Sequence, residues 1–114
     1  MISNPRNLAD RYFACMHGRD LDVLLTLSVD HATMILPDGT EIHGVAALRE
    51  MYKGLFAMSP PSPAPIAFIA GPDGVAVEIQ TSLPDGTTRL TANFFHLDGN
   101  GLIERLSVYK RGNW

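Results

Sequence analysis

The side chains with the clearest capacity for chemistry lie on a predicted β-hairpin made of strands 75–83 and 87–97. If the turn between them is centred on its Asp-Gly pair, Glu78 lies opposite Asn93. A partly buried carboxylate has its pKa raised toward neutrality and can then transfer a proton. An amide can donate a hydrogen bond to negative charge that develops on a substrate. Six polar residues share this face: Glu78, Gln80, Ser82, Arg89, Thr91 and Asn93.

The opposite face of the same hairpin is apolar: Val75, Val77, Ile79, Leu83, Leu90, Ala92 and Phe94. Composition alone favours burial of this face against helices and exposure of the polar face. A strongly curved sheet can do the reverse, with a polar interior around a ligand and an apolar exterior against a second subunit. The residue pattern leaves both orientations open.

The remaining reactive residue types give weaker signals. The four histidines have neither the helical pair spacing nor the cysteine partners of a metal site: His17, His31, His43 and His96. They are interpreted as surface or edge residues, Cys15 as a small core residue, and Asp38 as a turn residue. No metal ion and no cofactor are expected.

The elements that position these residues follow from periodicity. Helical spacing of apolar residues predicts three helices in the first half, at 4–18, 20–27 and 45–56. A short strand at 33–36 is expected to pair with 41–43, and the proline-rich stretch 59–65 is expected to be a linker. The period then changes to that of strands, at 66–70, 75–83, 87–97 and 102–110, separated by hairpin turns. The sequence therefore predicts helices followed by an antiparallel meander.

Length and composition restrict the function classes. A chain of 114 residues with 46% apolar and 18% charged residues predicts one folded domain over 1–114. A net charge of −3 argues against a nucleic-acid partner, and no apolar run approaches the roughly 20 residues of a membrane span. One cysteine and an N-terminus unlike a signal peptide favour a cytoplasmic protein.

The order of several short motifs resembles the NTF2-like superfamily, and within it the SnoaL-like proteins and the Δ5-3-ketosteroid isomerases. The motifs are Arg11-Tyr12-Phe13-Ala14, Asp20-Leu21-Asp22, Asp30-His31-Ala32-Thr33, Pro37-Asp38-Gly39, the run 44–52, the turn 98–103 and Val108-Tyr109. This resemblance implies an α+β cone, with three N-terminal helices packed on a strongly curved, mainly antiparallel sheet around a pocket. It also implies a homodimer formed through the outer face of the sheet.

The resemblance favours the polar face of the hairpin as the inner one. A small apolar ligand would then contact Leu36, Met51, Tyr52, Gln80, Thr91, Phe95, Leu106 and Val108. Val77, Ile79, Leu90 and Phe94 would form the dimer interface.

Ketosteroid isomerases combine a carboxylate base with a tyrosine and a protonated aspartic acid that donate hydrogen bonds to the developing oxyanion. In this sequence the donor tyrosine corresponds to Tyr12, a supporting tyrosine to Tyr52, and the protonated acid to Asn93. The base corresponds to Leu36, which cannot accept a proton. Glu78 is the candidate that would replace it.

Two functions follow from this resemblance. The first is a cofactor-free isomerase or polyketide-cyclase-type enzyme that moves a proton on an apolar carbonyl compound, with Glu78, Asn93 and Tyr12 as catalytic residues. The second is a non-catalytic module that binds a ligand or a protein partner. The missing base favours the second function, and the polar hairpin face favours the first.

Overall fold

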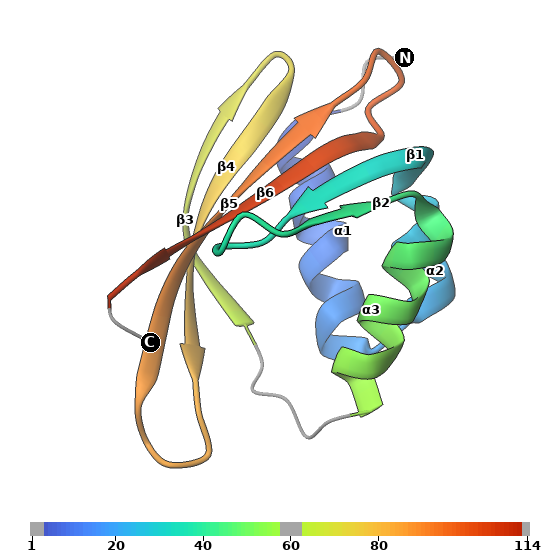
Figure 1. The fold of residues 1–114 in the computed structure, drawn as a ribbon. Helices are drawn as coiled ribbons and strands as arrows, with labels where there is room; N and C mark the ends of the chain where they lie inside the picture. The colour runs from blue at the N-terminus through green and yellow to red at the C-terminus, as the bar shows by residue number, and fades with distance from the viewer. Residues whose placement is uncertain (1–3, 58–62, 113–114) are drawn as a thin grey trace.

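Three helices cover one face of a curved six-stranded sheet (Figure 1). The computed structural model describes residues 4–57 and 63–112. Its helices are α1 (Pro5–Gly18), α2 (Leu21–Thr26) and α3 (Val45–Ala57). Its strands are β1 (Ser28–Ile35), β2 (Glu41–His43), β3 (Pro63–Gly71), β4 (Gly74–Ser82), β5 (Thr88–Leu97) and β6 (Ile103–Arg111). The expected α+β class is confirmed.

The strands run in the order β2-β1-β6-β5-β4-β3, and every neighbouring pair is antiparallel except β1 with β6. The meander β3 to β6 and the small β1–β2 pair agree with the predicted hairpins. The parallel pairing of β1 with β6 joins the two halves of the chain into one sheet. Within the described residues, no helix has both the length and the apolar character needed to cross a membrane.

The predicted linker is partly wrong, because β3 already begins at Pro63. Pro63 pairs with Thr81 and Pro65 with Ile79, and the register shifts between Pro65 and Ala67. Strand β3 is at the edge of the sheet, where a proline can lack its N–H without leaving a central ladder bond unmade. Residues 59–62 of the predicted linker fall within the part of the chain that is not described.

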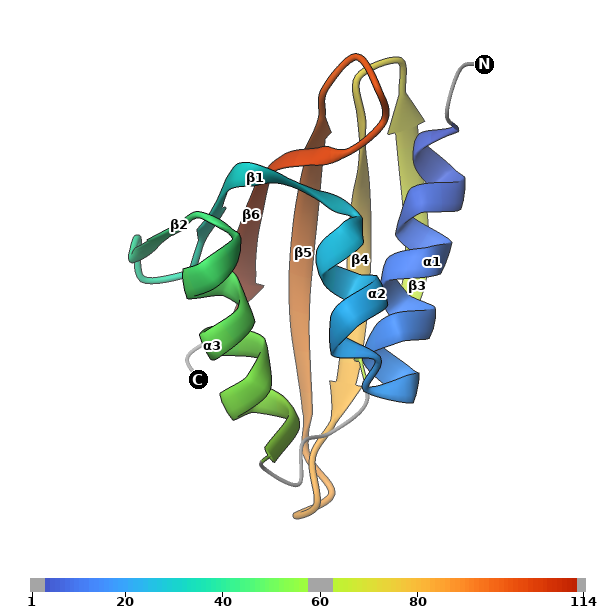
Figure 2. The same ribbon diagram turned by 90° about the vertical axis from the view of Figure 1, so that its right-hand side faces the viewer.

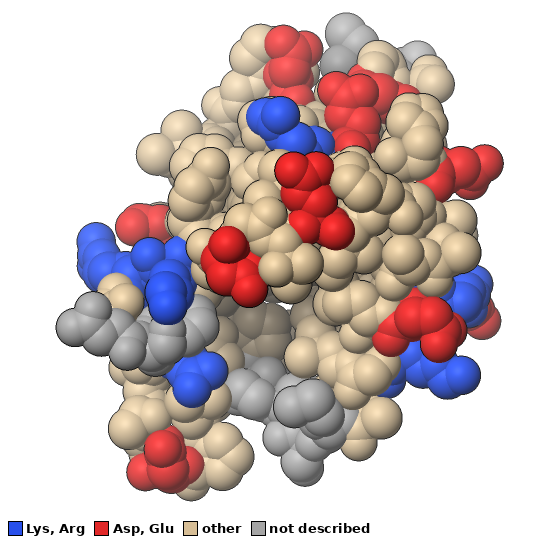
Figure 3. All heavy atoms as spheres, viewed as in Figure 1, with Lys and Arg blue, Asp and Glu red and all other residues tan. Residues whose placement is uncertain are grey.

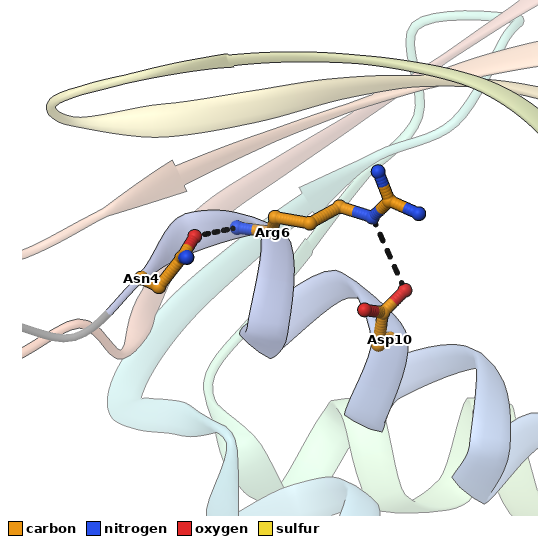
Figure 4. A network of polar contacts seen from close by, with 3 residues as sticks. All are labelled: Asn4, Arg6 and Asp10. Atoms are coloured by element: carbon orange, nitrogen blue, oxygen red, sulfur yellow. Dashed lines mark hydrogen bonds and ion pairs between the residues drawn. The ribbon is translucent and has the colours of Figure 1, made fainter.

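Helix α1 is fixed at its start by a local polar network (Figure 4). The Asn4 side chain accepts a hydrogen bond of 2.9 Å from the Arg6 backbone N–H, and Pro5 occupies the first turn. The Arg6 side chain pairs with Asp10 at 3.3 Å, and its guanidinium lies 3.5 Å from the centre of the Phe68 ring on β3. The start of α1 is thereby held against the edge strand.

The core lies between the helices and the concave face of the sheet. Helix α1 buries Leu8, Ala9, Tyr12, Phe13 and Cys15, and α3 buries Leu48 and Tyr52. The sheet contributes Ala32, Met34, Val75, Val77, Ile79, Phe95, Leu97, Ile103 and Leu106. Cys15 is a buried core residue, as the helical pattern predicts.

The β4–β5 hairpin has a different register from the predicted one. The Leu83 N–H donates to the Thr87 carbonyl at 2.8 Å, which encloses a three-residue loop that ends on Gly86 at φ +89°. The prediction assumed a two-residue turn. The extra loop residue places Asn93 opposite Val77, and Glu78 opposite Ala92.

A register change of one residue moves every side chain of one strand to the other face. The inner face of β4 is therefore Val75, Val77 and Ile79, all buried, while Glu78 and Gln80 are exposed on the outer face. Strand β5 has the expected orientation, with Thr91, Asn93 and Phe95 on the inner face and Leu90 and Phe94 outside. The predicted inward orientation was thus wrong for β4 and correct for β5.

Candidate functional site

A cavity of about 440 Å³ opens between the C-terminal ends of α1 and α3 and the far half of the sheet. The β4–β5 hairpin extends beyond the helix ends on this side (Figure 2), and the space-filling view is hollowed below its centre (Figure 3). The lining residues are Met16, His17, Gly18, Arg19, Leu55, Phe56, Pro63, Thr81, Thr91 and Val108. Its volume is within the range of roughly 300–1,000 Å³ that is common for small-molecule sites.

Each element brings its residues to the cavity for a local reason. Helix α1 ends at Gly18, and the next residue, Arg19, takes the left-handed conformation at φ 53°. This reversal directs the chain toward α2 and leaves His17 and Arg19 exposed at the cavity mouth. The strands contribute inward-facing positions: Thr81 follows Ile79 on β4, and Thr91 precedes Asn93 on β5.

Two tyrosines form a buried hydrogen-bonded pair next to the cavity. The Tyr12 and Tyr52 hydroxyl oxygens are 2.8 Å apart. Each ring lies one helical turn before a lining residue, since Tyr12 precedes Met16 on α1 and Tyr52 precedes Phe56 on α3. The pair therefore lies one turn deeper in the molecule than the lining.

Burial decides the protonation state of this pair. It raises the pKa of Tyr12 to about 12, although the hydrogen bond from Tyr52 acts in the opposite direction, and it raises the pKa of Tyr52 well above its ordinary value. Both phenols are therefore neutral at pH 7 and carry two protons. One of these two protons forms the hydrogen bond between the hydroxyl oxygens, so the other O–H can donate to a further acceptor.

Asn93 is the second buried polar group beside the cavity. It is 7% exposed and lies on the inner face of β5 between Thr91 and Phe95, opposite Val77 and Val108. Its amide makes no hydrogen bond to another residue in the described ranges 4–57 and 63–112. No fully buried side-chain nitrogen or oxygen of the described residues lacks a hydrogen-bond partner, so the Asn93 amide keeps some solvent access, where a ligand or a water molecule can satisfy it.

Asn93 and the tyrosine pair lie on the same side of the cavity. Two neighbours of Asn93, Thr91 and Val108, are lining residues. Its other neighbour on the inner face, Phe95, contacts the Tyr12 ring edge-on, with 4.9 Å between the ring centres. Neutral hydrogen-bond donors therefore lie just beyond the inner end of the cavity.

Of the ligand-contacting residues expected from the sequence, Thr91 and Val108 line the cavity. Tyr52, Phe95 and Leu106 are buried in the adjoining core, and Leu36 and Met51 are half-buried against it without reaching the lining. Leu36 lies just beyond β1, where its side chain offers no proton acceptor. Tyr12 and Asn93, two of the three expected catalytic residues, are close to this site.

The orientation expected for Glu78 and Gln80 is wrong. Both line a separate groove on the outer face of the sheet, together with Leu90, Tyr109 and Lys110. Glu78 is therefore on the opposite side of the sheet from Asn93 and cannot act on a ligand held in the cavity. The alternative of a solvent-facing Glu78 is the one observed.

No carboxylate lines the cavity among the described residues, and His17 and Arg19 are the titratable side chains that do. His17 was expected only as a surface residue, and no role was expected for Arg19. Both lie at the C-terminal end of α1, His17 in its last turn and Arg19 directly after it, and this end meets the sheet only in the folded chain. The apolar spacing of Tyr12 with Met16, and of Met51 with Leu55, was the available signal that these helix faces turn inward.

Comparison with known proteins identifies the fold. The SnoaL-like domain family matches residues 9–106 of this chain. A proposed ketosteroid isomerase from Kribbella flavida DSM 17836 superimposes with a TM-score of 0.83 at 20% identity, over 96% of this chain and 79% of that chain. The likeness establishes a shared fold.

Two further structures give the same result. A SnoaL-like protein of unknown function from Burkholderia thailandensis has a TM-score of 0.81 at 19% identity, with 95% of each chain covered. An NTF2-like protein of unknown function from Cytophaga hutchinsonii has a TM-score of 0.80 at 14% identity, over 97% of this chain and 92% of that chain. No match is found among curated proteins. The NTF2-like cone expected from the sequence is confirmed.

Proposed function

This chain belongs to the SnoaL-like domain family, and we propose that it is a non-catalytic binding protein for a small apolar compound that carries a carbonyl oxygen. One observation carries the proposal: the cavity of about 440 Å³ has an apolar wall, and no carboxylate among the described residues lines it. Proton abstraction next to a carbonyl needs a base within hydrogen-bond reach. Leu36 occupies the position where such a base is expected from the family resemblance.

The apolar body of the ligand would lie against Met16, Leu55, Phe56 and Val108. Burial of apolar surface supplies most of the affinity in such sites, and a few polar groups fix the orientation. The carbonyl oxygen would point inward, toward the Asn93 amide and the unused proton of the Tyr12–Tyr52 pair. A neutral acceptor suits these groups, because the amide and both phenols are uncharged at pH 7.

The proposal is tested by calorimetric titration with 4-phenylbutan-2-one and with butylbenzene, which has the same chain length without the oxygen. The ketone should bind about fivefold more tightly, the equivalent of one net hydrogen bond of about 1 kcal/mol. Asn93→Leu should remove this preference. Gln80→Leu changes a carboxamide on the outer face and should leave the preference unchanged. Equal binding of both probes by the unaltered protein would contradict the proposal.

Catalysis is the second candidate, and the neutral donors favour it, since the Asn93 amide and the spare O–H of the Tyr12–Tyr52 pair would also stabilise an enolate oxygen. The base would then be His17, the one lining imidazole among the described residues. Isomerisation of 5-androstene-3,17-dione, followed by ultraviolet absorbance, separates the candidates. No rate above buffer is expected. A rate that Tyr12→Phe and His17→Gln abolish would replace the binding proposal with an enzymatic one.

We also propose a homodimer through the outer face of the sheet. Ile66, Ile69, Phe94 and Tyr109 are exposed on this face or its edge, and the Phe94 and Tyr109 rings contact each other edge-on at 5.4 Å. The neighbouring groove carries both charge signs, on Glu78 and Lys110. A two-fold interface brings the same patch together twice, so one surface with both signs can complement itself. Val77 and Ile79, which were expected in this interface, are buried on the inner face and take no part in it.

A further inference from the structure

We infer that the ligand of the cavity carries a carboxylate at its outer end, which Arg19 binds at the mouth while the apolar body points inward. This inference rests on the proposed binding function and names the class of ligand. It begins from the distribution of charge over the lining. The inner wall is apolar, and the lining residues at the end of α1 are His17, Gly18 and Arg19. Arg19 is the one permanently charged residue among them, and no aspartate or glutamate of the described chain lies in the lining.

The Arg19 side chain is not engaged elsewhere in the described part of the chain. Ion pairs such as Arg6–Asp10, Glu41–His43 and Asp22–Arg49 do not include Arg19. The adjacent acid, Asp20, uses its carboxylate to accept a hydrogen bond of 3.3 Å from the Val23 N–H at the start of α2. The lining itself thus carries a formal positive charge, on Arg19, in a protein with a net charge of −3.

The backbone fixes the place from which this side chain extends. Arg19 has φ 53° and ψ 40°, a conformation that glycine adopts more readily, and it directly follows Gly18. Its N–H donates to the Met16 carbonyl at 3.4 Å, and the Asp20 N–H donates to the Cys15 carbonyl at 3.0 Å. Arg19 therefore has a backbone conformation that is unfavourable for a residue with a side chain, and its long cationic side chain extends from there beside the cavity. A guanidinium matches a carboxylate with two parallel hydrogen bonds.

Two hydroxyl groups complete the polar side of the lining. Thr81 and Thr91 are half-buried, and their side chains make no hydrogen bonds within the described residues. The lining thus offers one cation and two hydroxyls without a partner among the described residues, whereas Asn93 and the tyrosine pair beyond its inner end are neutral. This asymmetry selects an apolar acid over an apolar alcohol or amine, and it orients the acid group outward.

The test compares 4-phenylbutanoate with 4-phenylbutan-1-ol, which share one carbon skeleton, by calorimetric titration at low ionic strength. The acid should bind about fivefold more tightly, since a well-placed but partly exposed charge pair raises binding affinity by about this factor. Arg19→Gln should abolish the preference, and Arg19→Lys should retain most of it. Arg11→Gln removes the same charge from α1 at an exposed position outside the lining and should change nothing.

A cation near the end of α1 also interacts favourably with the helix dipole, which is a structural role. That role would appear in the thermal unfolding of the ligand-free protein, and it would not discriminate the acid from the alcohol. Equal affinity for the two probes, or a preference that survives Arg19→Gln, would overturn the carboxylate inference and leave the binding proposal standing. Binding of neither probe would overturn both.

Discussion

Removing one hydroxyl from the buried Tyr12–Tyr52 pair should destabilise the protein more than removing both. In Tyr52→Phe the Tyr12 hydroxyl loses its partner at 2.8 Å and remains in the core. An unsatisfied buried hydroxyl costs about 1–3 kcal/mol, so each single variant should lose about 2 kcal/mol of unfolding free energy. The double variant buries no hydroxyl at this place and should lie within about 1 kcal/mol of the unaltered protein.

The assay is urea unfolding followed by far-ultraviolet circular dichroism on the four members of this double-mutant cycle. The predicted coupling is about 3 kcal/mol, because two single losses of about 2 kcal/mol combine to about 1 kcal/mol rather than about 4 kcal/mol. Tyr109→Phe is the matched control, since it removes the same hydroxyl from a ring that is 59% exposed. The control should change the unfolding free energy by less than about 0.5 kcal/mol.

Strictly additive losses would refute the reasoning, because they would mean that the two hydroxyls contribute independently. Single losses as small as that of Tyr109→Phe would refute it as well. They would indicate that water or another group satisfies the remaining hydroxyl, and the spare donor proposed for the ligand would then already be occupied.

Three further outcomes are expected. Burial raises the pKa of Tyr12 from 10.0 to about 12, so the neutral phenol contributes fully to the unfolding free energy below pH 10 and loses up to about 3 kcal/mol of that contribution as pH rises toward 12. Urea unfolding across this pH range should show a smaller loss for Tyr12→Phe than for the unaltered protein, and the same pH dependence in both proteins would contradict the assignment. Gly74→Ala places a Cβ against the Phe95 carbonyl and should cost about 1–3 kcal/mol, whereas Gly71→Ala meets open space; equal melting temperatures for the two variants would argue against this close approach. Phe94→Glu should convert a dimer into a 12.4 kDa monomer in sedimentation, while Val23→Glu on α2, at the same 41% exposure, should leave the dimer intact; a monomeric unaltered protein at micromolar concentration would end the dimer proposal.

The elements of this fold were largely predictable from the sequence because apolar periodicity is local. Helix α3 follows the three- and four-residue recurrence of Leu48, Met51, Tyr52 and Leu55, and Asn4 with Pro5 marks the start of α1. The start of β3 was not predictable in this way. Prolines are excluded from paired central strands, and the sequence does not show that this strand lies at an edge.

The site was predictable only in part, because it depends on register. Counting the Pro84–Gly86 turn as a two-residue connection placed Glu78 opposite Asn93, whereas the three-residue loop places Val77 there. One residue of error was enough to move the expected base to the other face of the sheet. The order of apolar residues on β4 already favoured the observed orientation, and the resemblance to ketosteroid isomerases outweighed it.

The cavity mouth was outside the reach of sequence reasoning for another reason. His17 and Arg19 are exposed residues at the C-terminal end of a helix, a position where basic side chains are common whether or not a cavity is near. Only the packing of α1 and α3 against the sheet brings these residues to the same cavity as Thr81 and Thr91.

The most direct test of the binding proposal is a nuclear magnetic resonance titration of the ¹⁵N-labelled protein with 4-phenylbutan-2-one. Asn93 and Gln80 carry the same kind of side-chain amide on opposite faces of one hairpin, so each experiment contains its own control. The Asn93 side-chain signals and the backbone signals of Thr91 and Val108 should shift and saturate together, while those of Gln80 stay unchanged. Shifts at Gln80 with none at Asn93, or no shift at either residue, would contradict ligand binding in this cavity.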